Sequence, residues 1–191
     1  MEKEEEKIQD SFDFFQPKKD KFLEEEFSLP ERKIKPRKKD AKKLAQKLLK
    51  DYGYINGSVN LKEVIGFLQK KYTLYISGEK VTGKLDGMIA QFPEEDGTSF
   101  YVLNFNPDAP WVRRRFTIAH ELGHLLLETF CNGNTSTEIE QEAHIFAAEL
   151  LLPKKYFKEQ FLKHGDVKKL SEIFKVSTEA ITRKVMSDRL L

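Results

Sequence analysis

Residues 113–128 read RRRFTIAHELGHLLLE and hold the pattern H-E-x-x-H inside a largely apolar segment. Two histidines four residues apart on an α-helix are separated by about one turn. His120 and His124 would therefore point from the same face and present two imidazole nitrogens to one metal ion. Glu121 lies about 100° further round. From there its carboxylate can reach a water held by that metal without being a ligand itself, as a general base must.

This segment is predicted to be a buried helix on evidence that does not depend on the motif. Asp108 can cap the helix, and Pro110 is tolerated in its first turn. Apolar residues then occur on every side: Phe116, Ile118, Ala119, Leu122, Leu125, Leu126 and Leu127. Hydrogen-bonded core histidines are the competing interpretation. Because chance gives H-E-x-x-H in only about one such chain in a hundred, metal binding is favoured.

A third ligand must come from elsewhere, because a catalytic zinc takes three protein ligands and leaves one position open for water. Residues 138–152 form the next predicted helix, which ends before Pro153. Its apolar face comprises Ile139, Ala143, Phe146, Ala147, Leu150 and Leu151. Glu140 falls inside this stripe, whereas Glu142 lies off its centre and Glu149 lies further round. Glu140 is therefore the predicted ligand and Glu142 the fallback. The competing interpretation of Glu140 is an exposed acid in the first helical turn.

His144 follows Glu140 by four residues and lies on the neighbouring flank of the same predicted helix. It could orient Glu140 through a hydrogen bond or donate to the oxyanion of a tetrahedral intermediate. A half-buried histidine with a purely structural role fits the position equally well. Tyr101 is a second candidate for the oxyanion. The three arginines at 113–115 are expected to hold the helix start or a neighbouring acid.

Residues 114–127 (RRFTIAHELGHLLL) and 140–153 (EQEAHIFAAELLLP) resemble the ImmA/IrrE family of metallopeptidases. Members of that family typically read R-F-T-x-A-H-E-L-G-H and then E-x-x-A-N-x-F-A-x-x-L-L-M-P. The chain departs from this pattern at His144, where Asn is usual, and at Leu152, where Met is usual. The resemblance extends from about residue 40 to the C-terminus and is strongest around the two helices.

The resemblance has consequences for the site and for the substrate. It implies that His120, His124 and Glu140 bind one zinc ion per chain and that Glu121 is the catalytic acid and base. It further implies that the substrate is a helix-turn-helix transcriptional repressor, often encoded beside the peptidase, whose cleavage relieves repression. Nothing in this chain identifies that repressor.

The composition is that of a soluble globular protein, with 39% hydrophobic and 34% charged residues in a chain of 191. A formal net charge of +2 is too close to neutral to indicate nucleic acid by itself. The sequence contains no secretory leader and no apolar run long enough to span a membrane. We therefore expect a cytoplasmic protein without a membrane partner. The single cysteine, Cys131, excludes an internal disulfide and is expected to be a spare thiol rather than a fourth zinc ligand or a nucleophile.

The chain is predicted to have three regions. Residues 1–39 alternate acidic and basic runs and are expected to form a charged arm. Residues 40–153 contain the predicted zinc peptidase domain. Residues 154–191 form a helical appendage that reads like a helix-turn-helix, with Ser177 capping its last helix. That helix offers Arg183 and Lys184 but also Glu179, so we favour a structural or protein-binding role over DNA binding.

The expected fold class is α+β, with a small antiparallel sheet packed on the zinc helix and on the second ligand helix. Two helices precede the sheet, one over residues 40–52 and one capped by Asn60 and Glu63. Strands are predicted at 72–76, 87–92 and 99–105, with a hairpin between the last two. Residues 99–104 are the candidate edge strand for an extended peptide.

The predicted function is that of a zinc-dependent endopeptidase acting on a transcriptional repressor. Two alternatives belong to other classes. One is a DNA-binding regulator with a structural zinc site, and the other is a non-cleaving protein, such as one half of a toxin–antitoxin pair, that sequesters its partner. A structural zinc site usually has four Cys or His ligands and has no need of Glu121.

Overall fold

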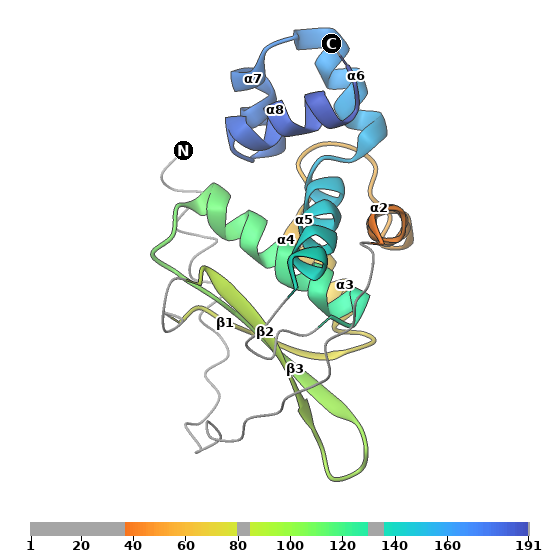
Figure 1. The fold of residues 1–191 in the computed structure, drawn as a ribbon, viewed down its shortest axis with the longest axis vertical. Coiled ribbons are helices and arrows are strands. Elements are labelled where there is room, and N and C mark those ends of the chain that lie inside the picture. The colour runs from red at the N-terminus through yellow and green to blue at the C-terminus, as the bar shows by residue number, and fades with distance from the viewer. Residues whose placement is uncertain (1–36, 80–84, 130–135, 191) are drawn as a thin grey trace.

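The computed structural model describes residues 37–79, 85–129 and 136–190, and these form seven helices and three strands. The predicted α+β class is confirmed. A small sheet lies on one side of helix α4 (Trp111–Leu127), and helix α5 (Thr137–Leu151) crosses α4 on the other side (Figure 1). No helix among these residues is long and apolar enough to cross a membrane.

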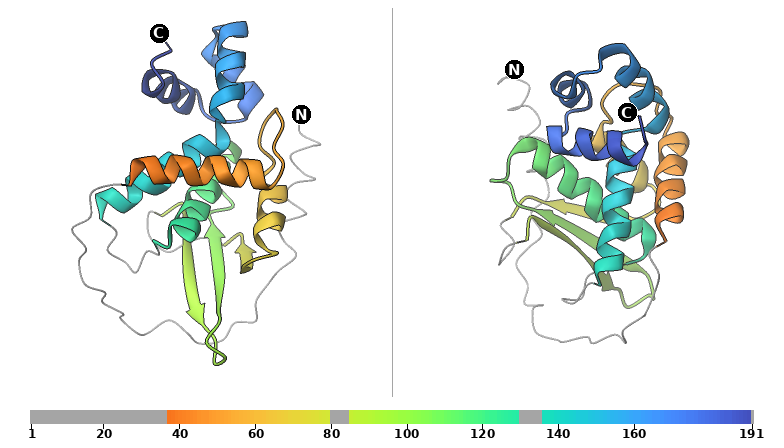
Figure 2. Two further views of the ribbon diagram at one scale, coloured as in Figure 1. Left: turned by 90° about the vertical axis from the view of Figure 1, so that its right-hand side faces the viewer. Right: turned by 45° about the horizontal axis from the view of Figure 1, so that its top comes forward.

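The sheet has the strand order β1-β3-β2 and is mixed, not antiparallel throughout. Strands β2 (Gly87–Pro93) and β3 (Ser99–Phe105) form the predicted antiparallel hairpin, whose turn projects from the body of the molecule (Figure 2). Strand β1 (Thr73–Ser77) pairs with β3 in parallel. This arrangement arises because β2 starts at the end of the sheet where β1 stops, but on the far side of β3.

The strand expected to lie at the edge of the sheet is central instead, so that expectation was wrong. β3 pairs with β1 on one side and with β2 on the other, which takes up its main-chain groups. The edge strand that packs on α4 is β2. A Cβ atom on Gly87 would come within 2.4 Å of Thr117 Cγ2 and 3.6 Å of Glu121 Cγ. The missing side chain of Gly87 therefore lets β2 lie directly against the metal-binding part of α4.

The two helices before the sheet form as their sequences predict. Helix α2 (Lys38–Asp51) buries one apolar stripe and lies across α5 (Figure 2). Helix α3 (Leu61–Leu68) starts at Asn60, whose Oδ1 accepts a 3.1 Å hydrogen bond from the backbone N–H of Lys62. The Asn60 amide also donates to the Glu63 carboxylate at 3.0 Å, which satisfies both groups at the helix start.

Helix α4 is almost completely buried along its central turns, as expected, but it starts later than predicted. Pro110 occupies the N-cap position and no side chain caps the helix, so the expected cap at Asp108 does not form. Pro has no N–H to satisfy at a helix start, which allows α4 to begin directly after it. Further along, a Cβ on Gly123 would lie 3.2 Å from Ala143 Cα. Gly123 therefore permits the close crossing that brings α5 over the histidines.

The C-terminal region consists of α6 (Lys154–His164), α7 (Val167–Phe174) and α8 (Thr178–Ser187). As predicted, the Ser177 hydroxyl caps α8 by accepting a 3.2 Å hydrogen bond from the backbone N–H of Ala180. The charged arm predicted at 1–39 falls outside the described residues except for its last three, and Cys131 falls outside them as well.

Candidate metal centre

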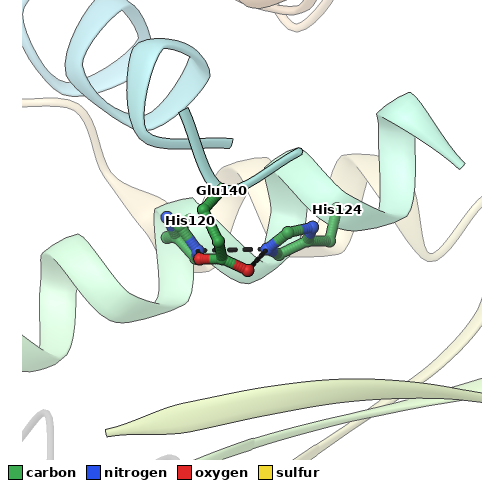
Figure 3. A group of neighbouring side chains, drawn as sticks. All are labelled: His120, His124 and Glu140. Carbon is green, nitrogen blue, oxygen red and sulfur yellow. Dashed lines mark hydrogen bonds and ion pairs between the residues drawn. The ribbon is translucent and has the colours of Figure 1, made fainter. Parts of the chain in front are cut away.

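Three side chains from two helices converge on one point: His120 and His124 from α4, and Glu140 from α5 (Figure 3). The Nε2 atoms of the two histidines are 3.0 Å apart. Glu140 Oε2 lies 3.1 Å from His120 Nε2, and its Oε1 lies 3.5 Å from His124 Nε2. A tetrahedral zinc with bonds of about 2.0–2.1 Å separates its ligand atoms by about 3.3–3.4 Å. The triangle therefore has the size needed to hold a metal ion.

The Glu140 carboxylate carries the charge that such a site requires. Hydrogen bonds from His120 and His124 hold the pKa of Glu140 well below its usual range. Its side chain is 40% exposed, so one side of the triangle faces solvent. An ionised carboxylate beside two imidazoles is a donor set suited to zinc, and the exposed side leaves access for water and substrate.

Glu121 lies beside the triangle and is not part of it, as its position on the helix predicted. The carboxylate is buried under β2 and accepts a hydrogen bond from the backbone N–H of Ile89. Its Oε2 atom has no hydrogen-bond partner among the described residues. Burial raises the pKa of Glu121. A buried carboxylate with one oxygen uncommitted is equipped to exchange a proton with a neighbouring group.

His144 lies next to the triangle on the α5 side. Its ring centroid is 5.0 Å from that of His120 and 5.0 Å from that of Phe116. Burial lowers the pKa of His144, and the charges of His120 and Arg183 lower it further. A largely neutral imidazole at this position can donate one hydrogen bond and accept another. Its predicted roles, as a partner of Glu140 or as an oxyanion donor, stay predictions.

The structure does not bring Glu142, the fallback ligand, to the histidines. Its carboxylate accepts hydrogen bonds from the backbone N–H of Arg37 at 2.6 Å and from the Arg37 guanidinium at 3.3 Å. The side chains of Glu142 and Glu149 are each 2% exposed and thus more deeply buried than that of Glu140. Helical periodicity ranked these two acids further from the core. The ranking was wrong because residues outside the α4 contact, in α2 and α8, also pack on α5.

Sequence reasoning missed Thr129, which contacts the far side of a candidate ligand. Glu128 has a φ of 54° and ends α4 in the left-handed conformation, which turns the next residue back toward the helix. The Thr129 hydroxyl consequently lies 3.1 Å from His124 Nδ1. With Nε2 directed at the triangle, Nδ1–H donates to that hydroxyl and fixes the ring. No periodic pattern signals such a contact, because it depends on the left-handed turn.

Replacing Thr129 by Val should weaken metal binding. The variant keeps the shape of the side chain but removes the acceptor that orients His124, and the loss of such partners typically costs about 10–100-fold in metal affinity. Competition with a chromophoric zinc chelator measures the change. Thr182→Val is the matched control, because its hydroxyl bonds a backbone carbonyl on the surface of α8. Equal affinities for the two variants would contradict the role of Thr129.

The arginines before the motif hold the start of α4, as expected. Arg113 forms an ion pair with Asp86, with Nη2 and Oδ2 2.6 Å apart. Arg115 is buried and donates to the backbone carbonyls of Val59 at 2.9 Å and Lys175 at 3.1 Å. Arg115 therefore ties the metal-binding helix to the turn between α7 and α8. Tyr101, the other oxyanion candidate, packs edge-on against Tyr72 at 5.8 Å.

The comparisons with known proteins agree with this site. The family model of the IrrE N-terminal-like domain, a peptidase family, matches residues 73–186, which is more than half of the chain. No curated protein matches the chain. Among solved structures, a Mycobacterium tuberculosis transcriptional regulator is similar in fold, with a TM-score of 0.53 at 18% sequence identity. The similarity covers 77% of this chain and 46% of the regulator, so the chain spans less than half of that protein's length. On the family match, the chain belongs to the ImmA/IrrE family.

Proposed function

We propose that the chain is a zinc-dependent endopeptidase that cleaves a helix-turn-helix transcriptional repressor and so relieves repression. The observation that carries the proposal is the triangle of His120, His124 and Glu140 with the uncommitted Glu121 carboxylate beside it. Membership of a peptidase family supports the reaction class. The likeness to a transcriptional regulator fits a role in transcription but concerns the fold alone.

In this proposal His120, His124 and Glu140 would hold one zinc ion per chain. When bound, zinc supplies a Lewis acid that lowers the pKa of a water molecule toward about 7. Glu121 would take the proton of the attacking water on Oε2 and pass it to the leaving amine. The hydrogen bond from the backbone N–H of Ile89 to the carboxylate keeps Glu121 in place while it does so.

Edge strand β2 offers a way to hold the polypeptide substrate. It packs on α4 beside Glu121, and its other side has no strand partner among the described residues. An extended peptide can add to such an edge by main-chain hydrogen bonding, which gives affinity with little dependence on sequence. This geometry suits an endopeptidase, because the substrate chain can continue in both directions past the metal.

The test is Glu121→Gln in the full chain, assayed by intact-mass spectrometry on the helix-turn-helix repressor encoded beside its gene. The amide is nearly isosteric but cannot accept the proton, so cleavage should slow by about 10²–10⁴-fold. Zinc content should stay unchanged, because Glu121 does not belong to the donor triangle.

The same pair of proteins separates the alternatives. If the Glu121→Gln variant relieves repression as well as the unmodified chain, the protein sequesters its partner and the peptidase proposal is wrong. A shift of duplex DNA whose affinity falls steeply with salt would instead favour a DNA-binding regulator.

A further inference from the structure

Helix α8 is attached to the peptidase core by an ion pair that is almost completely buried. Lys184 Nζ lies 2.7 Å from Glu149 Oε2 on α5 and 3.2 Å from Asp188 Oδ2, and the Lys184 side chain is only 4% exposed. The view in Figure 1 agrees, with α8 beside the upper part of α5 and on the same side of α4. A lysine held in this way is not available to a phosphate group. One of the two cations expected on a DNA-reading helix is therefore used inside the protein.

The other cation, Arg183, lies on the side of α8 that faces the metal centre. It follows directly from its neighbour's anchor on α5, and it is close enough to His144 to act on that ring electrostatically. The His144 ring is in turn 5.0 Å from His120. A continuous path of side chains, Arg183 to His144 to His120, thus leads from α8 to the candidate metal ligands.

Arg183 is free to bind another carboxylate at little cost. Its side chain is 73% exposed, and its partner is Glu179, one turn earlier on the same helix, at 2.6 Å. Exposed i,i+4 ion pairs of this kind contribute only about 0.3–0.5 kcal/mol. A guanidinium can also bind a carboxylate through two parallel hydrogen bonds, which an ammonium cannot do.

From this placement we propose that Arg183 determines substrate specificity by binding an acidic side chain of the polypeptide held at the metal centre. The helix-turn-helix-like unit would then form one wall of the peptidase site and would not read DNA. This inference rests on the proposed function, because it assumes that a polypeptide lies across His120 and His124. It assigns a role to a structural unit that the reaction itself leaves unexplained.

The test measures peptide binding by the zinc-loaded, full-length Glu121→Gln variant, so that binding is observed without turnover. The probes are fluorescein-labelled decapeptides in which each position in turn carries Asp, Asn or Lys. We expect one position at which Asp binds about tenfold more tightly than Lys in fluorescence anisotropy. Adding Arg183→Gln should abolish that preference, and adding Arg183→Glu should reverse it.

Lys169→Glu is the matched control, because Lys169 also forms an exposed ion pair within one turn, with Glu172 on α7. It should leave the preference unchanged. An unchanged preference in Arg183→Glu, equal losses in both variants, or no peptide binding at all would overturn the inference. So would a labelled DNA duplex whose binding is lost with Arg183→Glu alone, since α8 would then read nucleic acid. If the Arg183-dependent preference is found but the unmodified chain cleaves none of the peptides, the inference stands and the peptidase proposal fails.

Discussion

A Glu140→Ala variant should lose its metal, with affinity falling by more than the roughly 100-fold that loss of an outer partner can cost. The change removes the only carboxylate of the donor triangle and leaves two imidazoles, which are too few to hold zinc in a catalytic site. Zinc content of the purified protein, measured by inductively coupled plasma mass spectrometry after dialysis, gives the answer. The expected stoichiometry is one zinc per unmodified chain and none per variant.

Glu142→Ala separates the predicted ligand from the fallback. It should keep its zinc, because Glu142 bonds to Arg37 and not to the histidines. It should also unfold more easily, because the backbone N–H of Arg37 loses its acceptor. Loss of zinc from Glu142→Ala with retention by Glu140→Ala would overturn the assignment of the triangle. Absence of zinc from the unmodified chain, even after reconstitution, would leave the H-E-x-x-H helix as a core element without a catalytic metal.

Lys184→Met should be the most destabilising single change in the C-terminal region. It leaves Glu149 and Asp188 buried without their cation, and breaking a buried ion pair from one side costs about 3–5 kcal/mol. For a chain of this size that corresponds to a fall in Tm of roughly 6–20 °C. Thermal unfolding followed by circular dichroism measures it.

The neighbouring residue provides the control. Arg183→Met removes an exposed ion pair from the same helix and should change stability by less than about 1 kcal/mol. A double variant, Lys184→Met with Glu149→Leu, should recover much of the lost stability, because apolar side chains of similar volume often replace a buried ion pair without loss. If Lys184→Met and Arg183→Met have equal melting temperatures, Lys184 is not buried as described.

The positions of His120, Glu121 and His124 relative to one another could be predicted from the sequence, because they depend only on the pitch of one helix. The choice of Glu140 also needed only helical periodicity, since the acid had to share a stripe with the residues that pack on α4. The antiparallel hairpin followed from local turn residues in the same way. These features are set by interactions within about one or two turns of the chain.

The burial of Glu142 and Glu149 could not be predicted in that way. Periodicity identifies the most apolar face of α5, but α2 and α8 pack on its other sides and supply Arg37, Gln46 and Lys184 as partners. Whether an acid off the main stripe is solvated or buried in an ion pair depends on those distant segments. The sequence contains the partners but no local signal that joins them.

By itself the sequence therefore determined the class of fold, the family, and the spacing of the two histidines and the glutamate on the metal-binding helix, because each rests on local periodicity or on a contiguous motif. Only the tertiary structure decided that β2 is the edge strand beside Glu121, that Thr129 orients His124, and that α8 turns toward the metal centre. Those outcomes depend on strand order, on a left-handed turn and on a buried ion pair between helices 35 residues apart in the chain. They arise from long-range packing, in which the free energy of a contact depends on groups that the local sequence does not specify.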